Sequence, residues 1–213
     1  KFNRWEFLIQ IEDKFFNKYH NRNLLRIFSQ NIINYNITIP EKSILRINLA
    51  WINSINDLEE ILKKHIKSEI FLDLPIGRTK PPNNKYSFED LNIILTNNKN
   101  IKYLAISNVN SSKNIHRYIE NIPKHVSLVP KIESPESVKN IKEITDMLSN
   151  EKIIMLDHDD LYSNLIKQNE KPEKFKECIN KLTEFCKENN VVMLRTIGVI
   201  FSDEETRTTQ YMK

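Results

Sequence analysis

The sequence is short of glycine and cysteine, with only two residues of each among 213, and it contains no apolar run long enough to span a membrane. The scarcity of glycine excludes a Gly-rich loop of the kind that cradles phosphate groups. Cys178 and Cys186 lie eight residues apart on one predicted helix, which keeps them from forming a disulfide with each other. Two reduced thiols and the lack of a membrane span lead us to expect a cytoplasmic protein without a membrane partner.

A concentrated basic patch is also missing. The 32 Lys and Arg residues are interleaved with 28 Asp and Glu residues, for a formal net charge of +4. Proteins that bind nucleic acid usually gather basic residues on one face, so we expect no nucleic-acid partner. Hydrophobic residues make up 39% of the chain, which is enough for the core of one globular domain of this length.

The first 40 residues differ in pattern from the rest. Apolar residues recur there at helical spacing, and they include Trp5, Leu8, Phe15 and Phe16. We predict an N-terminal helical extension over residues 1–40, packed on a main domain over residues 41–213. Phe7–Ile11 could instead supply a strand to the main domain.

From residue 43 onward, short apolar segments alternate with amphipathic ones. The predicted strands are Ser43–Ala50, Glu69–Leu74, Ile101–Ser107, Ser127–Glu133, Lys152–Asp157 and Val191–Thr196. The predicted helices lie at about 54–66, 87–97, 111–121, 135–149 and 172–188. This alternation predicts an α/β fold with a mainly parallel sheet. We expect a TIM-type (β/α) barrel that is incomplete or divergent, because a closed barrel of that type needs eight strands.

Charged residues mark the ends of two of these strands. Lys131-Ile132-Glu133 ends one strand, and Asp160 follows the next, 27 residues after Glu133. In parallel β/α folds functional groups lie where strands end, and two carboxylates there can hold Mg²⁺ or Mn²⁺. Lys131 lies two residues before Glu133 and so points to the same side of the strand, within reach of a metal-bound substrate.

Segments from the whole main domain share one resemblance. In chain order they are Leu45–Trp51, Leu72–Thr79, Ala105–Ser107, Lys131–Glu133 with the following Val138–Ile144, Ile154–Leu161, and Thr196. Over about residues 43–196 they resemble, in order, the strand ends of the barrel domain of pyruvate kinase, in the phosphoenolpyruvate/pyruvate superfamily.

The resemblance implies a set of catalytic roles. Glu133 and Asp160 would ligate Mg²⁺ or Mn²⁺. Lys131 would stabilise the transferring phosphoryl group and the developing enolate. Arg46 would contact the phosphate of phosphoenolpyruvate, and Thr196 would lie over the enol carbon near the position of proton transfer.

It also implies supporting roles. Asn48, Asp73 and Ser107 would belong to a monovalent-cation site for K⁺. Asn48 would also lie near the substrate. Arg78 would be a nearby basic group, and Asp159 would stand where backbone approaches the substrate carboxylate.

The sequence departs from the family in ways that bear on function. Neither the family's C-terminal domain nor its inserted cap domain has a counterpart here, and only about ten residues, Lys80–Glu89, stand where the cap would be. Ala50 and Trp51 replace the family's Ser-His, and Leu74 replaces a threonine, so the K⁺ site is degraded. Asp159 replaces a glycine, which narrows or reshapes the pocket.

Individual residues keep alternative interpretations at this stage. Arg46 could form a structural ion pair with Asp73 in place of an anion contact. His158 could be incidental or a general acid or base. The acidic residues around it could recruit a second metal, but alternate residues on a strand face opposite ways, which argues against that site.

Three functions are compatible with the sequence. The leading one is a pyruvate-kinase-like, metal-dependent enzyme that binds phosphoenolpyruvate or pyruvate, stabilises its enolate and transfers phosphoryl to a non-standard acceptor. The second is a metal-dependent carbon–carbon lyase or aldolase acting on a 2-oxo acid. The third is a catalytically degenerate barrel that serves as a binding domain. Docking to a partner domain or to a second copy is compatible with each of them.

Overall fold

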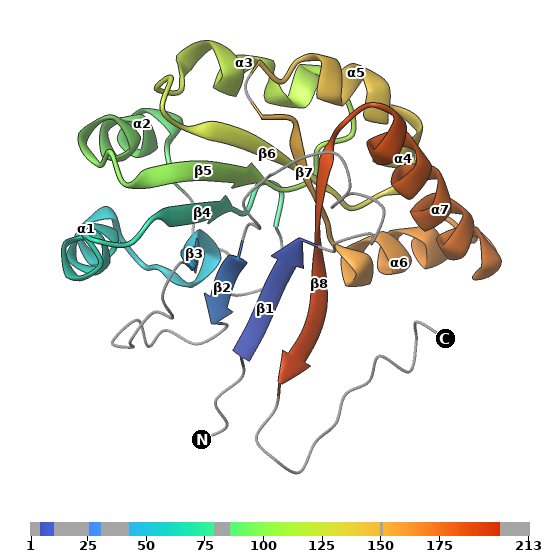
Figure 1. The fold of residues 1–213 in the computed structure, drawn as a ribbon, viewed down its shortest axis with the longest axis horizontal. Helices are drawn as coiled ribbons and strands as arrows, with labels where there is room; N and C mark the ends of the chain where they lie inside the picture. The colour runs from blue at the N-terminus through green and yellow to red at the C-terminus, as the bar shows by residue number, and fades with distance from the viewer. Residues whose placement is uncertain (1–4, 11–25, 31–42, 79–85, 150, 201–213) are drawn as a thin grey trace.

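The computed structural model describes residues 5–10, 26–30, 43–78, 86–149 and 151–200, with eight strands (Figure 1). The strands are β1 (Trp5–Gln10), β2 (Arg26–Gln30), β3 (Ile44–Asn48), β4 (Ile70–Leu74), β5 (Ile101–Ile106), β6 (Ser127–Ile132), β7 (Ile153–Leu156) and β8 (Val192–Ile200). The six strands predicted from the sequence correspond to β3–β8, and these predictions are confirmed.

The strands β3–β8 pair in chain order as a parallel sheet that curls into half of a barrel wall. β2 pairs in parallel with β3, and β1 pairs with both β2 and β8, so backbone pairing continues around a closed ring. However, β1 is antiparallel to both of its neighbours. The prediction of an incomplete α/β barrel is therefore confirmed in this coarser form, and the chain is not a full TIM barrel.

Helices surround the outside of the parallel sheet (Figure 1). They are α1 (Ile55–Lys64), α2 (Phe88–Asn97), α3 (Lys113–Asn121), α4 (Pro135–Lys139), α5 (Ile141–Asp146), α6 (His158–Lys167) and α7 (Glu173–Glu188). The helix predicted at 135–149 is divided at Asn140 into α4 and α5. The sequence prediction missed α6.

Two apolar clusters lie on opposite faces of the sheet. One contains strand residues such as Leu45 and Leu72 together with helix residues such as Leu58 and Leu91, so it lies between the sheet and the helices. The other contains strand residues only, namely Ile27, Ile44, Phe71, Ala105, Val129, Ile153, Met155 and Leu194. Because successive side chains on a strand point to opposite faces, this second cluster fills the barrel interior.

The predicted helical extension is wrong for both described parts of the first 40 residues. Trp5–Gln10 and Arg26–Gln30 are strands of the barrel. A short apolar segment of five or six residues fits a strand as well as a helix turn, and the open edges of the six-stranded sheet supply backbone partners for strands. The alternative of a strand near Phe7–Ile11 is confirmed in β1. The rest of the predicted extension lies outside the described residues.

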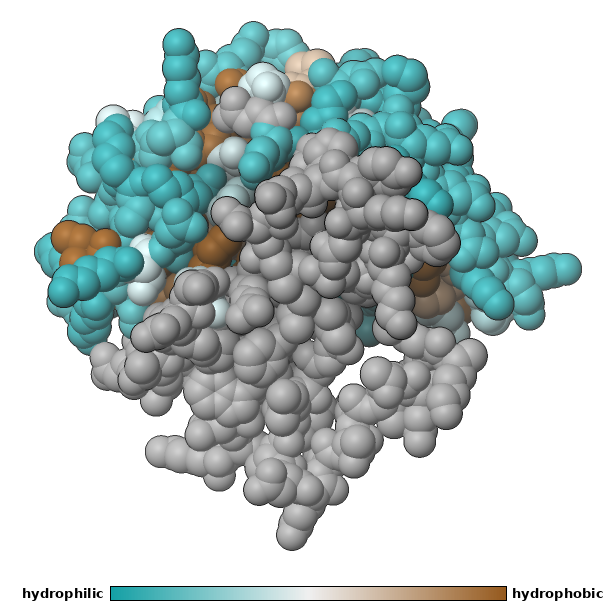
Figure 2. Space-filling view, in the orientation of Figure 1, coloured by the Kyte–Doolittle hydropathy of each residue, from teal (hydrophilic) through white to brown (hydrophobic). Residues whose placement is uncertain are grey.

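Large apolar side chains are few on the described surface. They are Ile66, Ile93, Tyr162 and Ile166, which lie on or next to three different helices. Figure 2 shows that the described part of this face is largely hydrophilic, with hydrophobic residues in separate small areas. Among the described helices, none has the length and apolar character needed to cross a membrane.

Candidate functional site

The charged residues that the sequence singled out converge at one end of the barrel interior. Arg46 lies near the end of β3, Asp73 near the end of β4, and Lys131 near the end of β6. Each lies two residues beyond a member of the interior cluster, so each side chain points inward. The carboxyl ends of the parallel strands therefore carry a polar layer above the apolar interior.

Lys131 is the centre of this layer. Its Nζ lies 2.7 Å from Glu133 Oε1, 3.4 Å from Asp157 Oδ2 and 3.9 Å from Asp73 Oδ2. The side chain is buried, and burial alone would lower the pKa of Lys131. The three carboxylates outweigh that effect and raise the pKa above its usual value, so the ammonium stays charged at neutral pH.

Asp73 connects two basic side chains. Its Oδ2 accepts hydrogen bonds from Nε and Nη2 of Arg46, with 3.2 Å for Nε, and it faces Lys131 as well. Burial acts to raise the pKa of Asp73, but the charges of Lys131 and Arg46 lower it below the usual value. The ion pair between Arg46 and Asp73, which the sequence left as an alternative, is thus present.

Glu133 is held from two sides by asparagines. The backbone N–H of Asn108 donates to Glu133 Oε2 at 2.7 Å, and Asn164 Nδ2 donates to the backbone carbonyl of Glu133 at 2.7 Å. The buried Oε1 atom lies 2.7 Å from Lys131 Nζ, which is its ion-pair partner. Burial raises the pKa of Glu133, against the effect of Lys131. Glu133 therefore presents Oε1 to a cationic group, which in this structure is the ammonium of Lys131.

Asp157 and Asp160 reach the same place from the start of α6. Asp157 is the N-cap of α6, and its Oδ1 accepts a hydrogen bond from the backbone N–H of Asp160 at 3.2 Å. Its Oδ2 faces Lys131. Burial and the neighbouring charge of Asp157 raise the pKa of Asp160.

The expectation that the acidic residues around His158 would alternate across a strand is wrong. The strand ends at Leu156, and a helix begins at His158. The one-turn spacing of a helix start brings Asp157 and Asp160 to one side, in place of the opposite faces that a strand would impose.

Glu133, Asp157 and Asp160 fit a hard divalent cation. Each offers one carboxylate oxygen, and these oxygens lie within 4.8 Å of one another. Oxygen ligands of Mg²⁺ at about 2.1 Å lie no more than about 4.2 Å apart, so small side-chain rotations would complete the site. An all-carboxylate donor set suits Mg²⁺ or Mn²⁺ and does not suit a soft metal. The predicted ligands Glu133 and Asp160 are brought together, and the structure adds Asp157.

The residues implied for the monovalent-cation site are engaged elsewhere. Asn48 Oδ1 accepts from the backbone N–H of Ala50 at 3.0 Å, as the N-cap of a short 3₁₀ helix at Leu49–Trp51. Asp73 is already paired with the basic side chains of Arg46 and Lys131. Ser107 is buried just after β5. These contacts disfavour a K⁺ ion at this position.

Other predicted residues lie around the rim. Arg78 is exposed beyond β4, and its charge lowers the pKa of both Asp73 and Asp160, which places it near the site. Asp159 is exposed in the first turn of α6. Thr196 lies on β8, and its role as a proton-transfer group stays a prediction. His158 packs its ring against Phe175, with 6.3 Å between ring centroids, and burial lowers its pKa.

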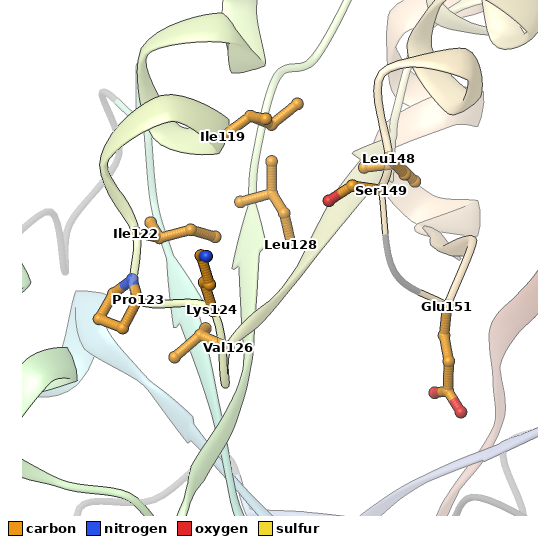
Figure 3. Close-up of a pocket in the computed structure, with 9 residues that line it drawn as sticks. All are labelled: Ile119, Ile122, Pro123, Lys124, Val126, Leu128, Leu148, Ser149 and Glu151. Carbon is orange, nitrogen blue, oxygen red and sulfur yellow. The ribbon is translucent and has the colours of Figure 1, made fainter.

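A pocket of about 310 Å³ lies at the opposite end of β6 from Glu133 (Figure 3). Its lining residues are Ile119, Ile122, Pro123, Lys124, Val126, Leu128, Leu148, Ser149 and Glu151. None of the predicted site residues borders it, so this pocket is separate from the acidic cluster.

Sequence reasoning missed Asn108 and Asn164, and it considered Asp157 only as part of a second metal site that it argued against. For Asp157 a signal was present, because an Asp three residues before another acidic residue and followed by apolar Leu161 is typical of a helix N-cap. The backbone of Asn108 has φ 56°, a left-handed conformation that Asn tolerates. Nothing in the local sequence linked Asn108 or Asn164 to Glu133, because each lies 25 or more residues away in the chain.

Comparison with protein-family models and with curated proteins found no match. Among solved structures, the chain is similar to the crystal structure of RipC from Yersinia pestis. The two share 16% sequence identity with a TM-score of 0.51, over 70% of this chain and 67% of that chain. At that identity the likeness shows the fold alone.

Proposed function

We propose that this chain is a divalent-metal-dependent enzyme, related to pyruvate kinase, that binds phosphoenolpyruvate or pyruvate and stabilises its enolate form. The observation that supports the proposal is the convergence of Lys131 with the carboxylates of Glu133, Asp157 and Asp160 at the carboxyl end of the strands. The segments that resemble pyruvate kinase include the carboxyl ends of these strands, where the charged residues lie.

The basic side chains would bind and stabilise negative charge. Lys131 is buried, so its ammonium would stabilise charge that develops on an enolate oxygen more strongly than the same group would in water. Arg46, oriented by Asp73, would contact the phosphate or carboxylate of the ligand. Arg78 at the rim would attract an anion toward the site.

A bound Mg²⁺ or Mn²⁺ would supply Lewis-acid stabilisation of the ligand's oxygen atoms. Glu133, Asp157 and Asp160 would hold that ion. The apolar interior below the polar layer would exclude water from one side of the ligand, which strengthens each electrostatic contact.

Phosphoryl transfer in this chain would use a non-standard acceptor. Only about ten residues connect Arg78 to α2, where pyruvate kinase carries the cap domain over its nucleotide. The acceptor would therefore differ from ADP, or a partner domain would complete the site.

The second candidate is a metal-dependent carbon–carbon lyase or aldolase acting on a 2-oxo acid. Among the described residues, four carboxylates, those of Asp73, Glu133, Asp157 and Asp160, lie with two buried basic side chains in this layer. A singly charged oxo acid meets less repulsion there than a phosphorylated ligand does. The retained lysine favours the first candidate, and the charge balance favours the second.

The test is a calorimetric titration of phosphoenolpyruvate, pyruvate and oxaloacetate into the protein with and without Mn²⁺, repeated on Glu133→Gln. The matched control is Glu60→Gln, on the exposed face of α1, which removes the same charge far from the site. We expect metal-dependent binding in the wild type and the control, and at least about a tenfold loss in Glu133→Gln.

The choice of ligand separates the candidates. Binding of phosphoenolpyruvate supports a phosphotransferase, whereas binding of the unphosphorylated acids alone supports the lyase or aldolase. If no ligand and no metal binds at millimolar concentration, the enzyme proposal is refuted and the chain is a degenerate barrel.

A further inference from the structure

We infer that the ammonium of Lys131 is an internal counter-ion, which occupies the carboxylate cluster in the metal-free protein and is displaced from it when a divalent cation binds. The inference rests on the proposed metal site. It adds that Lys131 and the divalent cation compete for the same carboxylates. This competition sets the metal affinity of the substrate-free protein.

The geometry places the ammonium where it must compete. Glu133 Oε2 already accepts a hydrogen bond from the backbone N–H of Asn108, so a cation would approach Glu133 most readily at Oε1. Lys131 Nζ already lies 2.7 Å from that Oε1 atom. A divalent ion bound to Oε1 at about 2.1 Å would then lie within about 4.8 Å of Nζ, and the two cations would repel each other.

The carboxylate of Asp157 is likewise shared between a backbone N–H and Lys131. One of its oxygens caps α6 through the N–H of Asp160, and the other lies 3.4 Å from Lys131 Nζ. The ammonium thus contacts two of the three carboxylates that would hold the metal. Only Asp160, the exposed member of the trio, has no ion pair with Lys131 within 4.0 Å among the described residues.

Asp73 offers a place to which the ammonium can move. Its Oδ2 lies 3.9 Å from Lys131 Nζ, on the side of the layer that also holds Arg46. Displacement toward Asp73 would leave the metal with Glu133 and Asp157. It would also leave Lys131 and Arg46 sharing one carboxylate, which is a favourable place for an incoming anion.

Metal and anionic substrate would consequently bind with positive cooperativity. Metal binding releases the ammonium of Lys131, which can then pair with the anionic substrate. The substrate in turn offsets the repulsion between Lys131 and the metal. By linkage each ligand raises the affinity for the other by the same factor.

The test is calorimetric titration of Mn²⁺ alone into the wild type and into Lys131→Met, which is similar in length and uncharged. Because the competing charge is gone and the carboxylates repel one another in the metal-free variant, we expect Mn²⁺ to bind Lys131→Met about tenfold or more tightly than the wild type. Lys142→Met is the matched control, because Lys142 is an exposed lysine paired with Asp146 on α5. The Mn²⁺ affinity of this variant should equal that of the wild type.

A second measurement covers the case in which Lys131→Met folds poorly. Thermal melting in EDTA should show a lower Tm for Lys131→Met than for the wild type, and saturating Mn²⁺ should raise the Tm of the variant by more than that of the wild type. Lys131→Arg, which keeps the charge, should show no such gain in affinity or Tm.

The outcomes separate this inference from the proposed function. If the wild type binds Mn²⁺ and Lys131→Met binds it equally or more weakly, the counter-ion inference is overturned while the metal site stands. If neither protein binds Mn²⁺, the metal site and the inference fall together.

Discussion

Asp73 shows how one buried carboxylate can organise a site. It lies between Arg46 and Lys131, and both basic groups depend on it for charge balance. The sequence identified all three residues at strand ends; the resemblance gave Asp73 to a monovalent-cation site, and the ion pair with Arg46 was left open as an alternative. Whether a carboxylate near a strand end meets a metal or an arginine depends on which strands are neighbours, and the local sequence does not record that.

Asp73→Asn should therefore destabilise the protein. Removing one partner of a buried ion pair leaves uncompensated charge, and we expect a loss of about 3 kcal/mol in the free energy of unfolding at pH 7. Urea denaturation measures it, with Glu60→Gln on the exposed face of α1 as a control that should change stability by less than about 0.5 kcal/mol.

The pH dependence of that loss has a defined sign. The pKa of Asp73 is lower in the folded protein than in the unfolded chain, so its stabilisation is present above about pH 4 and declines as the pH falls through the folded value. The wild type and Asp73→Asn should therefore converge in stability only in strong acid. A difference that vanished near pH 6 would contradict the ion-pair assignment.

The two thiols give a second prediction at this scale. Cys178 and Cys186 are both free and buried on α7, as the sequence predicted. Burial raises the pKa of both thiols, that of Cys186 to about 12. We expect a thiol-specific disulfide reagent at pH 8 to label native protein at least about tenfold more slowly than urea-unfolded protein. Rapid labelling of either cysteine in the native state would show that α7 does not pack as described.

At the scale of elements, α6 decides how the site is assembled. Its first turn brings Asp157 and Asp160 beside Glu133. The sequence prediction treated this segment as the end of a strand, so it found Asp160 as a strand-end carboxylate and rejected the wider acidic cluster. The predicted helices around residues 54–66, 87–97 and 172–188 were correct, whereas α6 was missed because its first turn follows β7 directly and was taken as the end of that strand.

Substitutions at Asp157 separate its capping role from its role in the site. Asp157→Asn keeps an N-cap oxygen for α6 but removes the charge, so stability should stay within about 1 kcal/mol of the wild type while Mn²⁺ affinity falls about tenfold. Asp157→Ala removes the cap as well and should lose about 1 kcal/mol more than Asp157→Asn. Urea denaturation and calorimetry measure the two quantities. Wild-type Mn²⁺ affinity in Asp157→Asn would exclude Asp157 from the metal site.

At the scale of the whole molecule, the sequence predicted β3–β8, offered β1 only as an alternative to a helix, and missed β2. β3–β8 are apolar strands with helices between them, and that alternation is visible in the sequence. β1 and β2 are five or six residues long, and their pairing is a property of the sheet edges they join. Nothing in the residues of β1 indicates that it runs antiparallel to its neighbours.

The same reasoning explains why the candidate site was only partly predicted. Lys131 lies on β6 and Glu133 is the first residue after it, so the alternation of side chains along the extended backbone already placed them together. Asn108, Asn164 and Asp157 reach Glu133 only because β5, β6 and β7 are adjacent in the curled sheet. The order of the strands in the sheet, more than any local motif, brings these groups within contact distance.

The most direct test of the central claim is the position of Mn²⁺ in crystals of the protein, located by its anomalous scattering. We predict one strong peak bounded by carboxylate oxygens of Glu133, Asp157 and Asp160, with Mn–O distances of about 2.2 Å, and with Lys131 Nζ farther from Glu133 than in the metal-free protein. A peak at another place, or none at saturating Mn²⁺, would contradict a metal-dependent site at the carboxyl end of the barrel.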